Sequence, residues 1–288
     1  MKKNSYKFLF TSDLHGNRYY YDLLLNIVKE ERTDYLLFGG DLLPSVSSSN
    51  SYFEMLYAQK EFAKEYFIPF VLFLENELPN LNIYYIPGNF DFKFPFFYLK
   101  EKNNKRFMEL SFRITFIDDN HFLFGYPFVP PTPFRPKDYE KLDDKNRSFP
   151  SQKIPSYITK SDKLIPVMPE ELLKNNRGTI KDDLFGWHIK TSWEAGIGIF
   201  HSPPYETYLD RIDGSIPCGS RAVTEFIIKN QPSITLHGHI HESIAITKRF
   251  SQRIGKTLCM NPGQKIFGFH YITFEFPPLD MIELHIVS

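Results

Sequence analysis

The chain has 288 residues, and its 34 lysines and arginines are balanced by 34 aspartates and glutamates, so the formal net charge is zero. This length is within the range of one large α/β domain and allows a sizeable hydrophobic core. The balanced charge argues against a nucleic-acid-binding protein or a nuclease, because such proteins usually show a basic excess or patch.

The first third of the chain alternates short apolar runs with stretches of helical spacing, which predicts a βαβαβ pattern. The strands are expected at residues 7–11, 35–38 and 82–86, and the helices at residues 19–31 and 51–78. The second helix should break or kink near Pro69. Each strand ends at a small or turn residue followed by a polar side chain. In open α/β sheets ligands bind beyond the carboxyl ends of the strands, so these side chains mark the expected site.

The middle of the chain loses this alternation after two further strands, expected at residues 111–117 and 121–126. Residues 127 to about 193 are rich in proline, lysine and aspartate. We expect an irregular insertion there, which could act as a lid and which contains one short helix at residues 169–173. With neither a repeat nor a linker to divide the chain, we predict a single domain over residues 1–288.

Regular patterns return in the last third of the chain. We expect Ser220 to N-cap a helix over residues 221–230. The strands are expected at residues 196–200, 233–236, 243–247, 257–260, 271–276 and 281–287.

Cysteine usage and hydropathy favour a cytoplasmic protein without a membrane span. Cys218 and Cys259 lie outside any CxxC pair and are typical of reduced thiols. The apolar run Phe8–Phe10 is too short for a signal peptide. The most apolar stretch, residues 66–74, contains Pro69 and cannot span a bilayer.

Five short segments carry metal-binding residue types, and each follows a predicted strand. They are Asp13-Leu14-His15, Gly40-Asp41, Gly88-Asn89, His201 and Gly238-His239-Ile240-His241. Carboxylate, amide oxygen and imidazole suit Mn, Fe, Zn or Co. Seven ligands exceed the need of one tetrahedral zinc and fit two divalent ions that share a bridging carboxylate. Two such ions neutralise phosphoryl oxygens and lower the pKa of a bridging water, which predicts phosphate-ester hydrolysis by a metal-bridging hydroxide.

The spacing within these segments suggests how the ligands converge. The paired ligands of the first and last segments are two residues apart, and on an extended chain this spacing aims both side chains to the same side. The glycines that precede three of the ligands, Gly40, Gly88 and Gly238, are expected to let the backbone turn tightly at the strand ends.

In this order the five segments resemble the calcineurin-like metallophosphoesterases, whose pattern is DxH, GD, GNH followed by an acid, a lone His, and GHxH. The resemblance spans residues 13–241. It implies a four-layer α/β/β/α sandwich of two mixed β-sheets flanked by helices. The implied ligands of one metal are Asp13, His15, Asp41 and His241, and those of the other are Asp41, Asn89, His201 and His239, with Asp41 bridging.

From this resemblance we assign catalytic roles to Asp41, Asn89 and His201, and substrate contact to Asn89. Asn17 could also contact substrate, although capping the helix that follows it is the favoured alternative. Asp91 and His237 are expected to be structural. The expected substrate is a small phosphate ester, and the sequence carries no information on an oligomer.

One position departs from the family pattern, because Phe90 stands where the family has a His. A phenyl ring can neither donate a hydrogen bond to phosphate nor protonate a leaving group. General acid–base help typically contributes about 10²–10⁴-fold, so we favour a phosphodiester or an ester with a stable leaving group. His188, in the insertion, is the candidate substitute acid. Phe90 also keeps open the alternative of a catalytically weak or inactive binding or scaffold protein on this fold.

Overall fold

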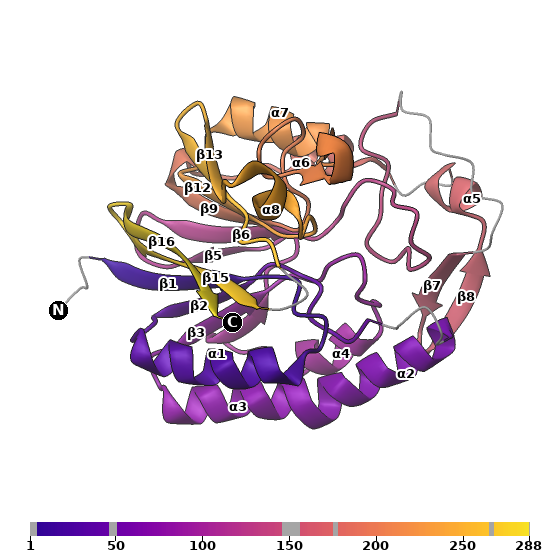
Figure 1. Cartoon of the computed structure of the whole chain (residues 1–288), viewed down its shortest axis with the longest axis horizontal. Coiled ribbons are helices and arrows are strands. Elements are labelled where there is room, and N and C mark those ends of the chain that lie inside the picture. The colour runs from indigo at the N-terminus through magenta and orange to yellow at the C-terminus, as the bar shows by residue number, and fades with distance from the viewer. Residues whose placement is uncertain (1–4, 46–50, 146–155, 175–177, 265–267, 288) are drawn as a thin grey trace.

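The structure is a computed structural model that describes residues 5–45, 51–145, 156–174, 178–264 and 268–287. Within these residues, two six-stranded mixed β-sheets stack face to face, and helices cover the outer face of each sheet (Figure 1). The expected α/β/β/α sandwich is therefore confirmed.

The first sheet has the strand order β16-β15-β1-β2-β3-β4. Its strands are β1 (Tyr6–Thr11), β2 (Tyr35–Phe38), β3 (Asn82–Tyr85), β4 (Phe107–Glu109), β15 (Phe269–Phe276) and β16 (Asp280–Val287). Strands β1 to β4 run parallel, and β15 pairs antiparallel with both β1 and β16. The predicted βαβαβ unit is thus present, and β4 is a strand that the sequence pattern did not indicate.

The second sheet has the strand order β13-β14-β12-β9-β6-β5. Its strands are β5 (Ile114–Phe116), β6 (Phe122–Tyr126), β9 (Gly196–Phe200), β12 (Ile234–His237), β13 (Ser251–Ile254) and β14 (Thr257–Met260). Its four central strands β14, β12, β9 and β6 are parallel, and both edge strands are antiparallel. The carboxyl ends of β9 and β12 therefore lie together at one edge of this sheet.

Helices flank both sheets (Figure 1). Those on the first sheet are α1 (Arg18–Glu30), α2 (Tyr52–Phe62), α3 (Ile68–Glu77) and α4 (Pro95–Lys100), and those on the second are α6 (Ile180–Gly186), α7 (Arg221–Asn230) and α8 (Ser243–Thr247). A π-helical turn, Ala63–Phe67, joins α2 to α3. It lies just before Pro69, which has no backbone N–H to donate, so the expected irregularity appears as a π-helical turn and the helix does not break.

Apolar side chains fill three layers between these elements. In β1, Leu9 packs toward the helices, whereas Phe8 and Phe10 pack between the sheets against residues such as Ile199 and Leu236. Such strands are buried on both faces, which is why their sequences read as continuous apolar runs. A third cluster, which includes Phe124 and Phe226, lies between the second sheet and α7.

The segment 127–193 is more regular than expected where the structure describes it. It contains a hairpin of β7 (Ser156–Lys160) and β8 (Lys163–Val167), the predicted short helix as α5 (Pro169–Lys174), and helix α6. A capping box between Thr179 and Asp182 starts α6. The prediction of an irregular insertion is wrong for these parts, and residues 146–155 and 175–177 lie outside the described residues.

One predicted strand, residues 243–247, is instead the single helical turn α8. Two isoleucines and a threonine gave this segment its strand-like composition. The chain must turn directly after the last predicted ligand, His241, and Lys248 closes the turn in the left-handed conformation with φ 60°. Strand propensity is weak over so few residues, and tertiary context overrides it.

Outside the two large sheets, β10 (Arg211–Ile212) and β11 (Ile216–Pro217) form a short two-stranded ladder. Among the described residues, no helix combines the length and the apolarity needed to cross a membrane.

Candidate metal centre

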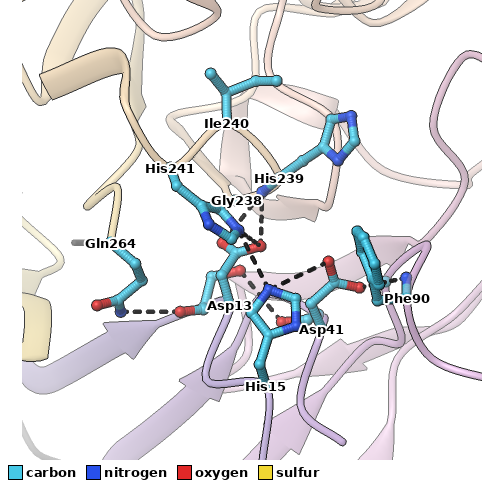
Figure 2. A network of polar contacts seen from close by, with 12 residues as sticks. Asp13, His15, Asp41, Phe90, Gly238, His239, Ile240, His241 and Gln264 are labelled. Atoms are coloured by element: carbon cyan, nitrogen blue, oxygen red, sulfur yellow. Dashed lines mark hydrogen bonds and ion pairs between the residues drawn. The ribbon is translucent and has the colours of Figure 1, made fainter. Parts of the chain in front are cut away.

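The seven predicted ligands meet where the carboxyl ends of five parallel strands face one another. Asp13 and His15 follow β1, Asp41 follows β2, and Asn89 follows β3. From the second sheet, His201 follows β9, and His239 and His241 follow β12. In Figure 2 the loop with His239 and His241 approaches Asp13, His15 and Asp41 from the opposite side. The two sheets thus each supply part of one cluster.

Four of these side chains offer donor atoms that fit a single cation. One ligand atom each from Asp13, His15, Asp41 and His241 lies within 4.8 Å of the others. His15 Nε2 is 3.3 Å from His241 Nε2, and His241 Nε2 is 3.2 Å from Asp13 Oδ1. Ligands about 2.0–2.2 Å from a metal lie at most about 4.4 Å apart. The 3.3 Å and 3.2 Å separations lie within this limit, and the 4.8 Å bound on the whole set exceeds it by about 0.4 Å, so a small inward movement of the side chains would let the four groups hold one ion.

The remaining ligands adjoin this set through Asp41. Its Oδ2 atom lies 3.9 Å from His15 Nε2 and 3.4 Å from His201 Nε2. His201 Nε2 is also 3.1 Å from Asn89 Oδ1, and the rings of His201 and His239 are 5.3 Å apart. One carboxylate oxygen thus stands between histidines of the two predicted ligand sets, which is where a bridging ligand would have to be.

Hydrogen bonds to the backbone fix the direction of these side chains. The ring nitrogen Nδ1 of His201 bonds to the carbonyl oxygen of Gly39 at 2.7 Å, which turns Nε2 toward Asp41. The backbone N–H of Phe90 donates to Asp41 Oδ1 at 2.8 Å and leaves Oδ2 facing the histidines. The N–H of His239 donates to both carboxylate oxygens of Asp13. Such outer contacts orient metal ligands and are part of a metal site.

The ligand loops adopt backbone conformations that side chains rarely take. Asp13 (φ 59°), His15 (φ 46°), Asp41 (φ 52°) and His239 (φ 67°) are all left-handed. The prediction that paired ligands converge because they sit on extended segments is therefore wrong: tight turns bring them together. Non-glycine residues in this region cost of the order of 1–3 kcal/mol each and cluster at functional sites.

Two glycines are needed because no Cβ fits beside the ligands. A Cβ on Gly88 would lie 2.3 Å from Asp41 Oδ1, and one on Gly238 would lie 2.6 Å from Asp13 Oδ2. Neither glycine has a positive φ, whereas Gly40 does (φ 105°). The expected tight turn thus applies to Gly40, and close approach explains the other two.

Burial and mutual charge shift the pKa values of the cluster in opposite directions. Burial would raise the pKa of Asp41, but the neighbouring imidazoles, His201 first and then His15, together hold that pKa below its usual value. Burial opposes the charged form of His201, yet the carboxylates, Asp41 first, raise its pKa to about 9. Asp13 and His241 form a second pair of this kind, with the pKa of the carboxyl lowered and that of the imidazole raised. Burial and the His201 charge lower the pKa of His239 to about 3.

The buried carboxylates therefore draw positive charge toward themselves, and the donor set matches what a divalent ion needs. His239 is held neutral, as a metal-ligating imidazole must be. Among the described residues, the buried atoms Asn89 Nδ2 and His15 Nδ1 lack a hydrogen-bond partner. Carboxylate, amide and imidazole ligands without thiolate fit Mn, Fe, Zn or Co. The residues present thus fit the predicted metal ions.

Neighbouring polar residues take the structural roles expected of them. Asp91 accepts hydrogen bonds from the backbone N–H groups of Leu42, Leu43 and Gly88. His237 is buried, and its ring nitrogens contact the carbonyl oxygen of Ser202 and the hydroxyl of Thr235.

Two other residues to which the sequence analysis gave possible roles, Asn17 in substrate contact and His188 as a substitute acid, lie away from the metal ligands. Asn17 is exposed, and its side chain caps α1 by accepting from the Tyr19 N–H at 3.1 Å. His188 lines a separate hollow with Trp187, Trp193 and Lys229. Neither is among the described residues that line the cavity over the cluster.

A cavity of about 690 Å³ opens over His15, Asp41, His239 and His241. Its further lining was missed from sequence, and it includes Tyr205, Cys218 and the segment Pro130–Phe134. A signal was present, since the proline-rich Pro130-Pro131-Thr132-Pro133 run comes shortly after β6, whose carboxyl end adjoins that of β9.

A family model described as calcineurin-like phosphoesterase matches residues 6–243. None of the curated proteins matches the chain in sequence. One solved structure superposes with a TM-score of 0.61 at 16% identity, and the match covers 99% of this chain and 100% of that one. The TT1561 protein of Thermus thermophilus superposes with a TM-score of 0.56 at 15% identity, again over 99% and 100% of the two chains. At these identities the two structures support the fold alone.

Proposed function

The chain belongs to the calcineurin-like phosphoesterase family, and on that premise we propose that it hydrolyses a phosphate ester with two divalent metal ions. The observation that carries the proposal is that Asp13, His15, Asp41 and His241 present ligand atoms within 4.8 Å of one another, while Asp41 Oδ2 also lies 3.4 Å from His201 Nε2. We assign Asp13, His15, Asp41 and His241 to one ion, and Asp41, Asn89, His201 and His239 to the other.

Bound divalent ions supply charge that neutralises phosphoryl oxygens, and they lower the pKa of a water so that hydroxide is available near neutral pH. The protein's own groups position the substrate. The Asn89 Nδ2 atom, which has no partner among the described residues, is free to donate to a phosphate oxygen. The His201–Gly39 and Phe90–Asp41 contacts keep the ligands from reorienting during the reaction.

We favour a phosphodiester over a phosphomonoester. Phe90 lines the cavity where the family pattern has a His, and its ring packs edge-on against the His15 ring at 5.4 Å. Position 90 therefore offers no proton donor for a poor leaving group. The described lining of the cavity also contains no lysine or arginine to balance a dianion.

A cytoplasmic location stays a prediction.

Hydrolysis of bis(p-nitrophenyl) phosphate and p-nitrophenyl phosphate by manganese-loaded protein tests the proposal. We expect turnover of the diester above the monoester, and its loss on EDTA treatment. His15→Ala should abolish the activity, whereas His121→Ala, a histidine that pairs with Asp118, should keep it. Full activity in His15→Ala would contradict the assignment.

The scaffold alternative rests on Phe90 as well. It predicts that the chain binds metal but turns over none of these esters with Mn, Fe, Zn or Co. Retention of all seven ligands, with their orienting hydrogen bonds, favours the enzyme.

A further inference from the structure

The cavity over the metal centre has two chemically different sides. Its floor contains the ligands His15, Asp41, His239 and His241. Its walls are mainly apolar or aromatic and are formed by Phe90, Pro130, Pro131, Pro133, Phe134, Tyr205, Ile212, Pro217 and Ile240. A ligand held by its phosphate at the floor would therefore place its organic part against these walls.

The charge of the walls excludes highly charged organic groups. The described lining residues include neither lysine nor arginine, and outside the metal centre their one carboxylate is that of the exposed Glu242. Among these described wall residues, a second phosphate or carboxylate on the ligand would meet no lysine or arginine and would be repelled by Glu242. The walls thus suit an uncharged group.

Two aromatic rings stand at the transition from floor to wall. The Phe90 ring lies 4.7 Å from the Phe134 ring and 5.4 Å from the His15 ring. Phe134 is nevertheless 42% exposed, so much of its ring remains open to a ligand. A flat apolar group could pack on this open ring, and aromatic pairs gain from such contact.

The wall segment Pro130–Phe134 is held in place by a buried ion pair. Lys137 Nζ and Glu140 Oε2 lie 2.8 Å apart with both side chains fully buried. Glu140 accepts from the Thr132 N–H at 3.1 Å, and Lys137 donates to the carbonyl oxygens of Thr132 and Phe134. Three prolines fix further φ angles. Because the Lys137 charge is matched by Glu140, the ion pair shapes the wall without adding a free cation.

We propose that this wall selects phosphate esters whose organic part is uncharged, flat and apolar, with Phe134 as a specificity-determining contact. The inference rests on the proposed function, since it takes the phosphate to be bound at the metal centre. It adds the chemical class of the group beside the phosphate, namely an aryl or similar apolar substituent.

Equilibrium binding tests the inference without turnover. Diphenyl phosphate and dimethyl phosphate carry the same charge and differ in apolar surface, so we compare their affinities for the manganese-loaded chain by calorimetry. Burial of a phenyl ring should strengthen binding about 10- to 100-fold. Equal affinities, or no binding of diphenyl phosphate, would overturn the inference.

Two phenylalanine variants locate the effect. Phe134→Ala should remove most of the preference for diphenyl phosphate. The matched control is Phe116→Ala, an exposed phenylalanine on β5 outside the cavity lining, which should keep it. Thermal unfolding of both variants checks that they fold. An unchanged preference in Phe134→Ala would contradict its assigned role.

Hydrolysis of bis(p-nitrophenyl) phosphate is scored separately. Preferential binding of diphenyl phosphate without hydrolysis of any ester would overturn the proposed function and support the apolar binding site. Hydrolysis of bis(p-nitrophenyl) phosphate without a binding preference for diphenyl phosphate would support the proposed function and overturn the apolar binding site.

Discussion

A Cβ atom placed at Gly88 tests how closely the metal centre is packed. In Gly88→Ala the new methyl would lie 2.3 Å from Asp41 Oδ1, 2.4 Å from the Asp41 backbone nitrogen and 2.6 Å from His201 Cε1. Real Cβ contacts are longer than 3.0 Å, so atoms must separate by about 0.7 Å, and overpacking of this kind costs about 1–3 kcal/mol. Both Asp41 and His201 are predicted ligands, so a shift of either side chain would move a donor atom away from its metal ion.

We expect Gly88→Ala to lower kcat/KM for the diester by about 100-fold, because a misplacement near 1 Å has that effect in active sites. Metal affinity should fall by about 10- to 100-fold, as it does when outer contacts of a site are lost. Steady-state kinetics and manganese titration measure the two quantities, and urea unfolding measures the stability cost.

Gly186→Ala is the matched control. Gly186 ends α6, has no positive φ, and a Cβ there would meet nothing within 4 Å. We expect unchanged activity and a stability gain of about 0.5–1 kcal/mol. If Gly88→Ala bound manganese and hydrolysed the diester like the unaltered chain, the reasoning from close packing would be refuted.

Three further substitutions test separate parts of the structure. Phe90→His should raise the rate on an alkyl phosphate such as glycerol 2-phosphate, whose leaving group needs a proton, by about 10²-fold or more, because a general acid is restored; an unchanged rate would show that this position does not limit the reaction. Glu140→Gln should cost about 3–5 kcal/mol in urea unfolding, because it removes the carboxylate that faces the buried Lys137 ammonium; a loss below about 1 kcal/mol would contradict this. Burial lowers the pKa of His237 from 6.5 to about 3 in the folded chain. Because the unfolded chain therefore binds this proton more readily, the stability of the fold is unaffected above pH 6.5 and falls as the pH drops from 6.5 toward 3, by up to about 1.4 kcal/mol per pH unit. In His237→Gln that part of the acid sensitivity should disappear from the pH dependence of unfolding, and an identical pH profile would contradict the assignment.

The buried strands and the candidate ligands leave local signals in the sequence, whereas the four-layer arrangement was implied by the resemblance to the family. Apolar runs mark strands that are buried on both faces, and a polar residue at each strand end marks the edge where a site forms. Asp41, Asn89 and His201 follow three such strands and meet at the centre. The order of the motifs along the chain then indicated which protein family the sequence resembles.

What could not be predicted depends on contacts between distant segments. The left-handed backbone of Asp13 and Asp41 arises from loops that support one another, as when the Asp13 N–H donates to the Gly40 carbonyl oxygen. Residues 243–247 have strand-like composition and form a helical turn because the chain must bend there. The Lys137–Glu140 pair reads as two surface charges in the sequence, and its complete burial follows from the packing of the insertion.

The central claim is that seven side chains hold two cations with Asp41 between them. Anomalous X-ray diffraction from crystals of manganese-loaded protein tests it most directly. We predict two anomalous peaks about 3.5–4 Å apart, one beside His15 and His241 and one beside His201 and His239, with an Asp41 oxygen between them. Density without a peak at these side chains, or ions bound elsewhere on the chain, would contradict the account.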